Sequence, residues 1–380
     1  MNKKIKVLAG AAALVALVIA GSLLSVRLWG GKGSTAVLAG PLAYSSGMTP
    51  EQFAAANDLP REVASAAFGS RFGPPGHYGE LPPDGLKASV ERELALYNEA
   101  ASKNWRKILL KFVMWSAFLA AVFPLLRRGF LQGAPRNWVY LAAVLLFGVA
   151  LGADPSPMGT VKDAVVLYGR SGAIFPPRLI ALFFFLLLVV AANKFICSWG
   201  CQLGVLQDLL FRLGRAGELK RWRPPFSFTN TVRVLFFIAL VLAALLLDTD
   251  IIEPVDPFKI YSPLAPSVWG WAGITLLLGA SLFVYRPWCH LFCPFGLAGW
   301  LAEKISVYRI KVDYAKCVAC GACAKACPST VMGAILKRDR AIPDCFSCGD
   351  CLAACPARAV SFSAGRRETP PADKFKSQGA

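Results

Sequence analysis

Long apolar segments alternate with short polar ones along most of the chain. Six apolar runs approach the roughly 20 residues that a helix needs to cross a bilayer, and the third of them is the shortest. They cover residues 7–26, 108–126, 138–151, 179–196, 232–247 and 268–285. The pattern predicts an α-helical polytopic membrane protein with about six transmembrane helices.

The polar segments divide the chain into further units. Residues 1–30 are predicted to form an N-terminal transmembrane anchor, and residues 31–104 a small helical module outside the bilayer, where Thr49 and Pro50 give a helix-start signal. Residues 105–306 form the transmembrane core, 307–362 a polar compact domain, and 363–380 a disordered tail. The alternative for the first span is a cleaved signal peptide with Ala39 at the cleavage site, although its apolar run is longer than usual.

Composition agrees with a membrane protein. Apolar residues make up 56% of the chain and charged residues 17%, against roughly 45–50% and 25% in soluble domains. The formal net charge is +18, but Lys and Arg lie mainly in loops and in the C-terminal part. Topology control and anionic lipid account for them there, so we predict no nucleic-acid partner.

The distribution of charge predicts an orientation. Five basic residues lie in the loop 204–230, whereas the loop 248–267 has four acidic residues and one lysine. Because basic loops stay in the cytoplasm, we expect both termini inside and residues 31–104 in the periplasm of a bacterial inner membrane. Lys103, Arg106 and Lys107 conflict with this orientation, since they would flank the second span on the outside.

Two cysteine pairs occupy equivalent places in an internal repeat. The third and fourth spans lead through Asp154-Pro155 to KFICSWGC, and the fifth and sixth lead through Asp256-Pro257 to RPWCHLFC. Parallel repeats are related by an axis along the membrane normal, which would bring the pairs together at one depth. If each helix continues, both cysteines of a pair share one face. The cysteines concerned are Cys197, Cys201, Cys289 and Cys293.

Three interpretations of these four thiols stay open. They are predicted to form a four-thiolate metal site at the cytoplasmic edge of the membrane, which could hold a third iron–sulfur cluster. They could instead act as reversible dithiols. The third interpretation is that they are small buried apolar residues, although two matched pairs favour a functional role.

Two further cysteine runs have the spacing C-x2-C-x2-C-x3-C-P. This is the pattern of bacterial two-cluster ferredoxins, in which the fourth cysteine of each run ligates the other cluster. The polar domain is therefore predicted to be an α+β bacterial-type 2[4Fe-4S] ferredoxin. Cluster one would take Cys317, Cys320, Cys323 and Cys355, and cluster two Cys345, Cys348, Cys351 and Cys327. Such clusters need a reducing compartment, which agrees with a cytoplasmic C-terminus.

The evidence is weaker for residues that could bind a haem or transfer protons. The chain has only His77 and His290 and no C-x-x-C-H, so it lacks the paired axial ligands of a membrane haem, and we predict no haem. His290 could accept a quinol proton near neutral pH. Asp154 and Asp256 could take part in proton transfer, or each could simply start a turn.

The arrangement resembles the NapH/NosR-like family of polytopic membrane iron–sulfur proteins, whose members have two C-x3-C-P motifs after transmembrane helices and then a two-cluster ferredoxin domain. Cys289, Cys293 and Pro294 match the motif completely, whereas Gln202 stands where the first motif would have proline. The resemblance covers about residues 105–362. It implies membrane-bound electron transfer between the quinone pool and other redox subunits of a complex, often a periplasmic cytochrome or iron–sulfur protein.

The sequence therefore predicts a quinol dehydrogenase-like electron-transfer subunit whose direction of electron flow is not encoded. The principal alternative is a redox assembly or maturation factor whose C-x3-C dithiols reduce metals or disulfides for a partner enzyme. A redox sensor, in which the clusters regulate the outer module, is the third hypothesis.

Overall fold

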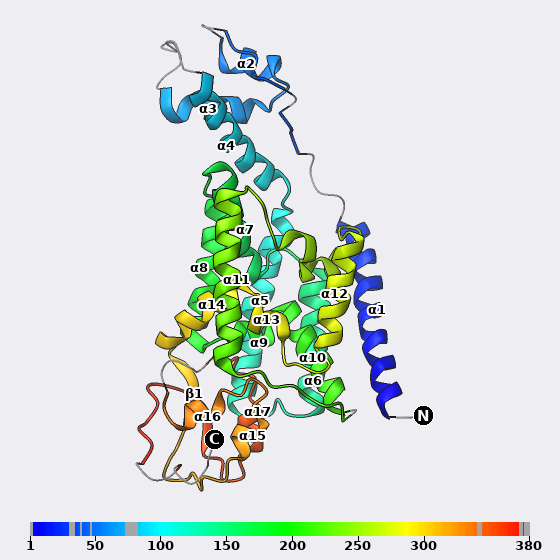
Figure 1. Cartoon of the computed structure of the whole chain (residues 1–380), viewed down its shortest axis with the longest axis vertical. Coiled ribbons are helices and arrows are strands. Elements are labelled where there is room, and N and C mark those ends of the chain that lie inside the picture. The colour runs from blue at the N-terminus through cyan, green and yellow to red at the C-terminus, as the bar shows by residue number, and fades with distance from the viewer. Residues whose placement is uncertain are drawn as a thin grey trace.

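The computed structural model describes residues 3–29, 35–38, 40–45, 48–72, 83–216, 218–339, 344–371 and 375. His77 and Ala39 lie outside these residues. The molecule is elongated, with helices α2–α4 at one end, a helix bundle in the middle and the cysteine-rich C-terminal domain at the other end (Figure 1). Helix α1 begins at the end where the C-terminal domain lies.

Apolar helices lie at all six predicted spans. Three are long and apolar enough to cross a membrane: α1 (Lys3–Trp29), α5 (Trp105–Arg127) and α11 (Phe226–Leu246). Three are shorter: α6 (Ala134–Ala143), continued by the π-helix η1 (Val144–Ala150), α8 (Pro176–Ala192) and α12 (Val268–Ala280). The predicted helical membrane fold is confirmed, and by length alone three of the described helices reach a full span.

The two shorter helices that lead to the cysteine pairs are followed by breaks. After α8 come the five-residue α9 (Phe195–Trp199) and α10 (Gln202–Ala216). After α12 come the five-residue α13 (Pro287–Leu291) and α14 (Pro294–Ala302). The helix therefore does not continue through either cysteine pair, which was the condition for both cysteines to share one helix face. Broken helices are tolerated inside a membrane protein where the irregular backbone is buried in protein.

Helix α7 (Pro157–Ser171) was not predicted. Ser156 caps it by accepting a hydrogen bond from the backbone N–H of Gly159, and the helix packs between α8 and α11. Asp256 does start a turn, because its carboxylate accepts from the N–H of Phe258 at the beginning of the 3-10 helix η3 (Pro257–Tyr261). A second 3-10 turn, η2 (Glu253–Val255), precedes it.

The module at residues 31–104 contains α2 (Pro50–Ala56), α3 (Arg61–Phe72) and α4 (Pro83–Ala101). Thr49 caps α2 in a capping box with Gln52, and Phe53 packs edge-on against Phe68 in a separate buried core. Helix α4 ends at Ala101, and Asn104 caps α5 as a new helix.

The C-terminal domain has the predicted α+β character. Strand β1 (Tyr308–Val312) pairs antiparallel with β2 (Val360–Ala364), in the register Tyr308 to Ala364. Between them lie α15 (Ala322–Ala326), α16 (Met332–Leu336) and α17 (Asp350–Ala354), and the turn η4 (Glu303–Ile305) precedes them. Strand β2 enters the predicted tail by two residues, and Arg367 beyond it donates to the carbonyl of Ile310.

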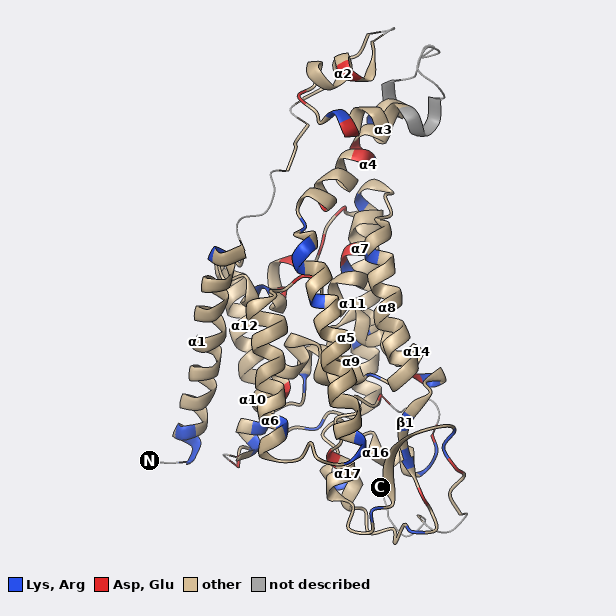
Figure 2. Cartoon of the chain, turned by 180° about the vertical axis from the view of Figure 1, so that it is seen from behind, with Lys and Arg blue, Asp and Glu red and all other residues tan. Residues whose placement is uncertain are grey.

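Two of the three basic residues that conflicted with the predicted orientation, Lys103 and Lys107, have acidic or aromatic partners. Lys103 Nζ lies 3.2 Å from Glu99 and 3.5 Å from Asp154, and Lys107 lies over the ring of Trp29. Figure 2 shows further Lys and Arg at the opposite end of the bundle, where α1 begins. Because local carboxylates offset Lys103, it weighs less against the orientation than its sequence position indicates.

Candidate metal centres and the interface between them

The C-terminal domain has a small cavity lined by cysteines of both runs. Cys317, Cys320 and Cys323 line it from the first run, and Cys355 reaches it from the second. Leu336 and Val360 contribute apolar wall. The fold therefore brings together the four thiols predicted to hold cluster one, and their chemistry fits an iron–sulfur cluster.

The other four cysteines of the domain also lie together. The thiols of Cys345, Cys348 and Cys351 each interact electrostatically with that of Cys327 from the first run. This is the set predicted for cluster two. Among the described residues no group of three or more His, Cys, Asp or Glu side chains has the spacing for one metal ion; a four-iron cluster spaces its thiolates more widely than one ion does.

The two C-x3-C pairs converge inside the helix bundle, where α9 and α13 lie close together (Figure 1). Every pair among the four thiols interacts electrostatically. Cys197, Cys201 and Cys289 are buried, and Cys293 is partly exposed. We call these four residues the cysteine-motif site. Because α10 and α6 continue beyond it towards the end where α1 begins, the site lies within the bundle rather than at its end.

Both halves of the site have the same backbone. The N–H of Cys201 donates to the carbonyl of Ile196 at 2.7 Å, and the N–H of Cys293 donates to that of Trp288 at 3.0 Å. Each bond reaches back five residues, so it closes a wider turn than an α-helix does and interrupts the helix between the two cysteines. The motifs thus agree in geometry although Gln202 replaces proline in the first.

A glycine permits each turn. A Cβ on Gly204 would lie 2.7 Å from the carbonyl oxygen of Cys197, and a Cβ on Gly296 would lie 2.7 Å from that of Cys289. Both contacts are closer than real Cβ atoms show. The glycine three residues after each second cysteine therefore lets the new helix pack against the first cysteine.

Helix N-termini point at two of the thiols. The thiol of Cys201 receives backbone N–H groups from Leu203 and Gly204 at the start of α10, and that of Cys293 receives the N–H of Gly296 in α14. Such amides, and the positive end of the helix dipole, favour the thiolate that binds metal.

Buried cations surround the site. Arg286 donates to the carbonyl of Cys197 at 2.6 Å and to Asp208 at 2.8 Å. Lys194 and Arg233 both contact Asp344 and the carbonyl of Gly296. Three cations and two carboxylates leave a local charge of +1 before the thiols are counted. This excess suits a centre that thiolates make negative.

The loop that carries the cluster-two cysteines docks onto this site. We call residues 344–347 the docking segment. Its Phe346 ring is buried, with Lys194 Nζ 4.4 Å and the His290 ring 5.0 Å from the ring centroid. Trp199 Nε1 donates to the carbonyl of Ser347 at 3.2 Å. The cysteines predicted for cluster two, rather than those predicted for cluster one, therefore lie beside the cysteine-motif site.

Charge contacts reinforce the docking. Burial raises the pKa of the Asp344 carboxyl, but the charges of Lys194 and Arg233 outweigh this effect and hold the pKa below its ordinary value. Asp350, beside the cluster-two cysteines, pairs with Arg136 and with Arg212 at 3.1 Å. The charged contacts thus tie the C-terminal domain to several helices of the bundle.

The three candidates for proton transfer, His290, Asp154 and Asp256, lie in different parts of the structure. His290 lies within the cysteine-motif site, with Nδ1 3.9 Å from Asp344, and its Nε2 has no hydrogen-bond partner in the described part of the chain. Asp154 and Asp256 lie far from it in the sequence, near the module end, and they are not equivalent. The side chain of Asp154 is half exposed beside Lys103, whereas that of Asp256 is mostly buried, 3.5 Å from Lys162.

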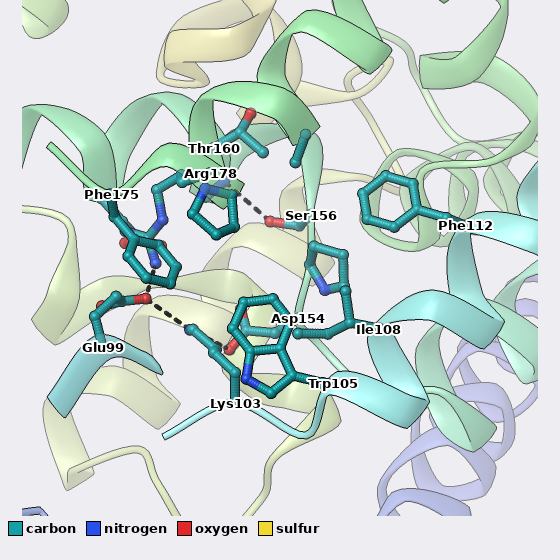
Figure 3. A pocket seen from close by; sticks show the side chains of 15 residues that line it. Glu99, Lys103, Trp105, Ile108, Phe112, Asp154, Ser156, Thr160, Phe175 and Arg178 are labelled. Carbon is teal, nitrogen blue, oxygen red and sulfur yellow. Dashed lines mark hydrogen bonds and ion pairs between the residues drawn. The ribbon is translucent and has the colours of Figure 1, made fainter. Parts of the chain in front are cut away.

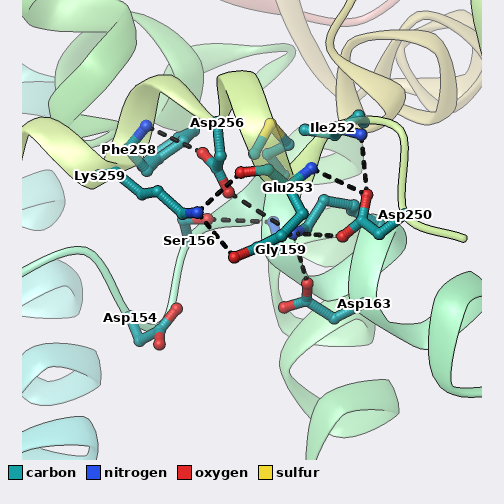
Figure 4. Close-up of polar contacts among 12 residues, drawn as sticks. Asp154, Ser156, Gly159, Asp163, Asp250, Ile252, Glu253, Asp256, Phe258 and Lys259 are labelled. Atoms are coloured by element: carbon teal, nitrogen blue, oxygen red, sulfur yellow. Dashed lines mark hydrogen bonds and ion pairs between the residues drawn. The ribbon is translucent and has the colours of Figure 1, made fainter. Parts of the chain in front are cut away.

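Lys162 of α7 is the centre of an acidic cluster. Its Nζ lies 2.9 Å from Asp250, 3.1 Å from Asp163 and 3.5 Å from Glu253. Figure 4 shows these three acids together with Asp256. Burial lowers the pKa of Lys162, but the surrounding acids outweigh this effect and raise it. Asp256 therefore belongs to this ion-pair cluster, and its predicted part in proton transfer stays a prediction.

Sequence reasoning missed the charged partners of the motifs. Lys194 and Arg286 each lie three residues before the first cysteine of a pair. A basic residue at the same offset in both repeats, directly after an apolar run, was the available signal. Phe346 and Asp344 gave no such signal, because their roles depend on contacts with residues more than fifty positions away.

Comparison with known proteins agrees with this geometry. Residues 309–356 match the model of a 4Fe-4S dicluster domain. The ferredoxin-type protein NapH of Escherichia coli K12 is 28% identical over 147 residues, which is 37% of this chain and 50% of NapH. The chain is thus similar to NapH over part of its length and contains a segment that matches a 4Fe-4S dicluster domain. The predicted resemblance is thereby confirmed.

Other relatives extend the comparison. YccM of the same organism, named as a candidate electron transport protein, is 28% identical over 177 residues, 43% of this chain and 49% of YccM. An uncharacterised protein of Methanocaldococcus jannaschii is 27% identical over 176 residues, 45% of this chain and 72% of that protein. The matches to NapH and YccM span about half the length of each. No solved structure matches.

Proposed function

We propose that this protein is a membrane-bound electron-transfer subunit that links the quinone pool to a redox partner through iron–sulfur clusters. In this proposal the ferredoxin cysteines hold two [4Fe-4S] clusters in the predicted crossed pairing. The names of YccM and NapH, an electron transport protein and a ferredoxin-type protein, support the electron-transfer role. The membrane would be a bacterial inner membrane, with the C-terminal domain in the cytoplasm and other redox subunits as partners.

One observation carries the proposal: the docking segment inserts beside the cysteine-motif site. Phe346 contacts Lys194 and His290, both within three residues of a motif cysteine, and it directly follows the cluster-two cysteine Cys345. A bound cluster would accept and return one electron without rearranging its bonds. A third cluster on the motif cysteines would then lie next to cluster two, and the two would form the membrane end of a relay.

The test is the iron and acid-labile sulfide content of anaerobically purified protein. Two [4Fe-4S] clusters hold about eight irons. We expect more than eight per chain in the parent, and eight in a Cys197→Ser/Cys289→Ser variant. Ser198→Ala is the matched control, because Ser198 is equally buried between the motif cysteines but supplies no thiol.

The same measurement separates the proposal from a redox assembly factor. If the parent and the double variant both hold eight irons, the motif cysteines bind no iron and the dithiol alternative takes over. Alkylation with and without a reductant would then show whether Cys197 and Cys201 interconvert between thiol and disulfide. All twelve cysteines are free in the structure.

A further inference from the structure

A cavity lies at the module end of the bundle, where α5, α7 and α8 begin (Figure 3). Its internal volume is about 60 Å³, and the open space at its mouth raises the total to about 470 Å³. Trp105, Phe112 and Phe175 give aromatic walls, while Lys103, Asp154 and Arg178 supply polar groups. We propose that this cavity binds the head group of a quinone or quinol; the inference rests on the proposed function.

The walls suit a flat, lipid-soluble ring. Trp105 and Phe175 have ring centroids 6.2 Å apart, and Phe112 packs edge-on against Phe184 behind them. Trp105 is 46% exposed. In an apolar bundle this exposed ring meets lipid, so a hydrophobic molecule could reach the cavity from the bilayer past Trp105.

The charges of the cavity favour a neutral ligand. Two cations, Lys103 and Arg178, face three carboxylates, Glu99, Asp154 and Asp163, which leaves a net charge of −1. Arg178 pairs with Glu99 and lies 3.2 Å from Asp163. This balance opposes phosphate or another anion, yet it provides donors for a quinone carbonyl and an acceptor for a quinol hydroxyl.

The cavity is connected to the cysteine-motif site by one short loop. The carbonyl of Ala153, next to Asp154, accepts a hydrogen bond from Gln202 Nε2 at 3.0 Å, and Gln202 directly follows Cys201. On the same loop the carbonyl of Gly152 accepts from Lys111 Nζ at 2.7 Å. A ligand in the cavity would therefore be separated from Cys201 by a few bonded groups.

The chemistry balances when the iron–sulfur centres accept the electrons. Quinol oxidation breaks two O–H bonds and releases two electrons and two protons. The electrons would pass singly to two oxidised iron–sulfur centres held by the cysteines of the chain, and each centre would gain one electron. One proton goes to the carboxylate of Asp154 and the other to water at the mouth of the cavity. Quinone reduction is the reverse of these steps.

The test fills the cavity without touching the cysteines. Ala181 lines the cavity from α8, and its neighbour Ile180 faces away, so Ala181→Phe and Ile180→Phe form a matched pair. Binding of decylubiquinone and menadione would be measured by thermophoresis on holoprotein in lipid nanodiscs. We expect Ala181→Phe to weaken binding at least tenfold, with unchanged iron content and dithionite-reduced spectrum, and Ile180→Phe to bind like the parent.

Further variants keep the test decisive. Trp105→Ala removes an exposed wall residue, so it tests the site even if Ala181→Phe folds poorly; we expect at least fivefold weaker binding. Asp154→Asn should bind within about threefold of the parent but slow the reduction of the clusters by decylubiquinol at least tenfold. Parent-like binding by both Ala181→Phe and Trp105→Ala would overturn the site, as would an equal loss in Ile180→Phe.

The outcomes also separate the site from the function. If decylubiquinol reduces the clusters equally in the parent and in Ala181→Phe, the proposed function stands and the cavity is the wrong site. If the parent holds its full iron but neither binds a quinone nor is reduced by a quinol, the link to the quinone pool fails and the cavity assignment fails with it.

Discussion

The glycine that follows each cysteine pair gives the sharpest test of the cysteine-motif site. Gly296→Ala would place a Cβ 2.7 Å from the carbonyl of Cys289, so α14 or the carbonyl must shift and move Cys293. We expect the variant to lose the iron above eight per chain and to keep both ferredoxin clusters, as measured by iron analysis and electron paramagnetic resonance.

Gly279→Ala is the control for this substitution. Gly279 lies in α12, and an added Cβ there would meet nothing within 4 Å. It should hold as much iron as the parent, since alanine favours a helix over glycine by roughly 1 kcal/mol. Full iron in Gly296→Ala would show that the close contact does not govern the site.

At the scale of elements, the docking segment depends on a buried ion pair. Asp344→Asn leaves Lys194 and Arg233 without their shared carboxylate, and removing one partner of a buried pair costs about 3–5 kcal/mol. We expect a lower midpoint of thermal unfolding and slower electron exchange between cluster two and the membrane centre. Freeze-quench spectroscopy after a reductant pulse would measure the exchange.

Asp313→Asn is the matched control in the same domain. Asp313 pairs with Lys316 at 3.1 Å, but both side chains are exposed, and such surface pairs contribute only about 0–1 kcal/mol. If Asp344→Asn behaves like Asp313→Asn in both measurements, this ion pair does not stabilise the docking of the segment.

The elements also show what a sequence can predict. Apolar runs and cysteine spacing depend on neighbours in the chain, and they located the apolar helices and both cysteine runs. The break between Cys197 and Cys201 was missed because the periodicity of the run continues through it. Helix α7 was missed because Asp154-Pro155 reads as a turn. The contacts of Phe346 join distant segments, and no local pattern records such contacts.

For the whole molecule, the proposed sites follow one another along the bundle. The cavity lies at the module end, the cysteine-motif site lies inside the bundle, and cluster two and then cluster one follow in the C-terminal domain. Buried cations, among them Lys194 and Arg286, lie beside the cysteine-motif site in the middle of this order. The order would let a quinone exchange protons at one side of the membrane while electrons leave at the other.

This order requires the module and the C-terminal domain to lie on opposite sides of the membrane. The prediction can be checked by adding one cysteine at a time to the parent at an exposed position: Ser45→Cys in the module or Ser361→Cys in β2. In intact cells whose outer membrane has been made permeable, a membrane-impermeant maleimide should label Ser45→Cys and leave Ser361→Cys and the parent unlabelled. After lysis under reducing conditions, Ser361→Cys should react too. Labelling of Ser361→Cys in intact cells would reverse the orientation that the basic loops predict, and the proton side of the proposed quinone site would reverse with it.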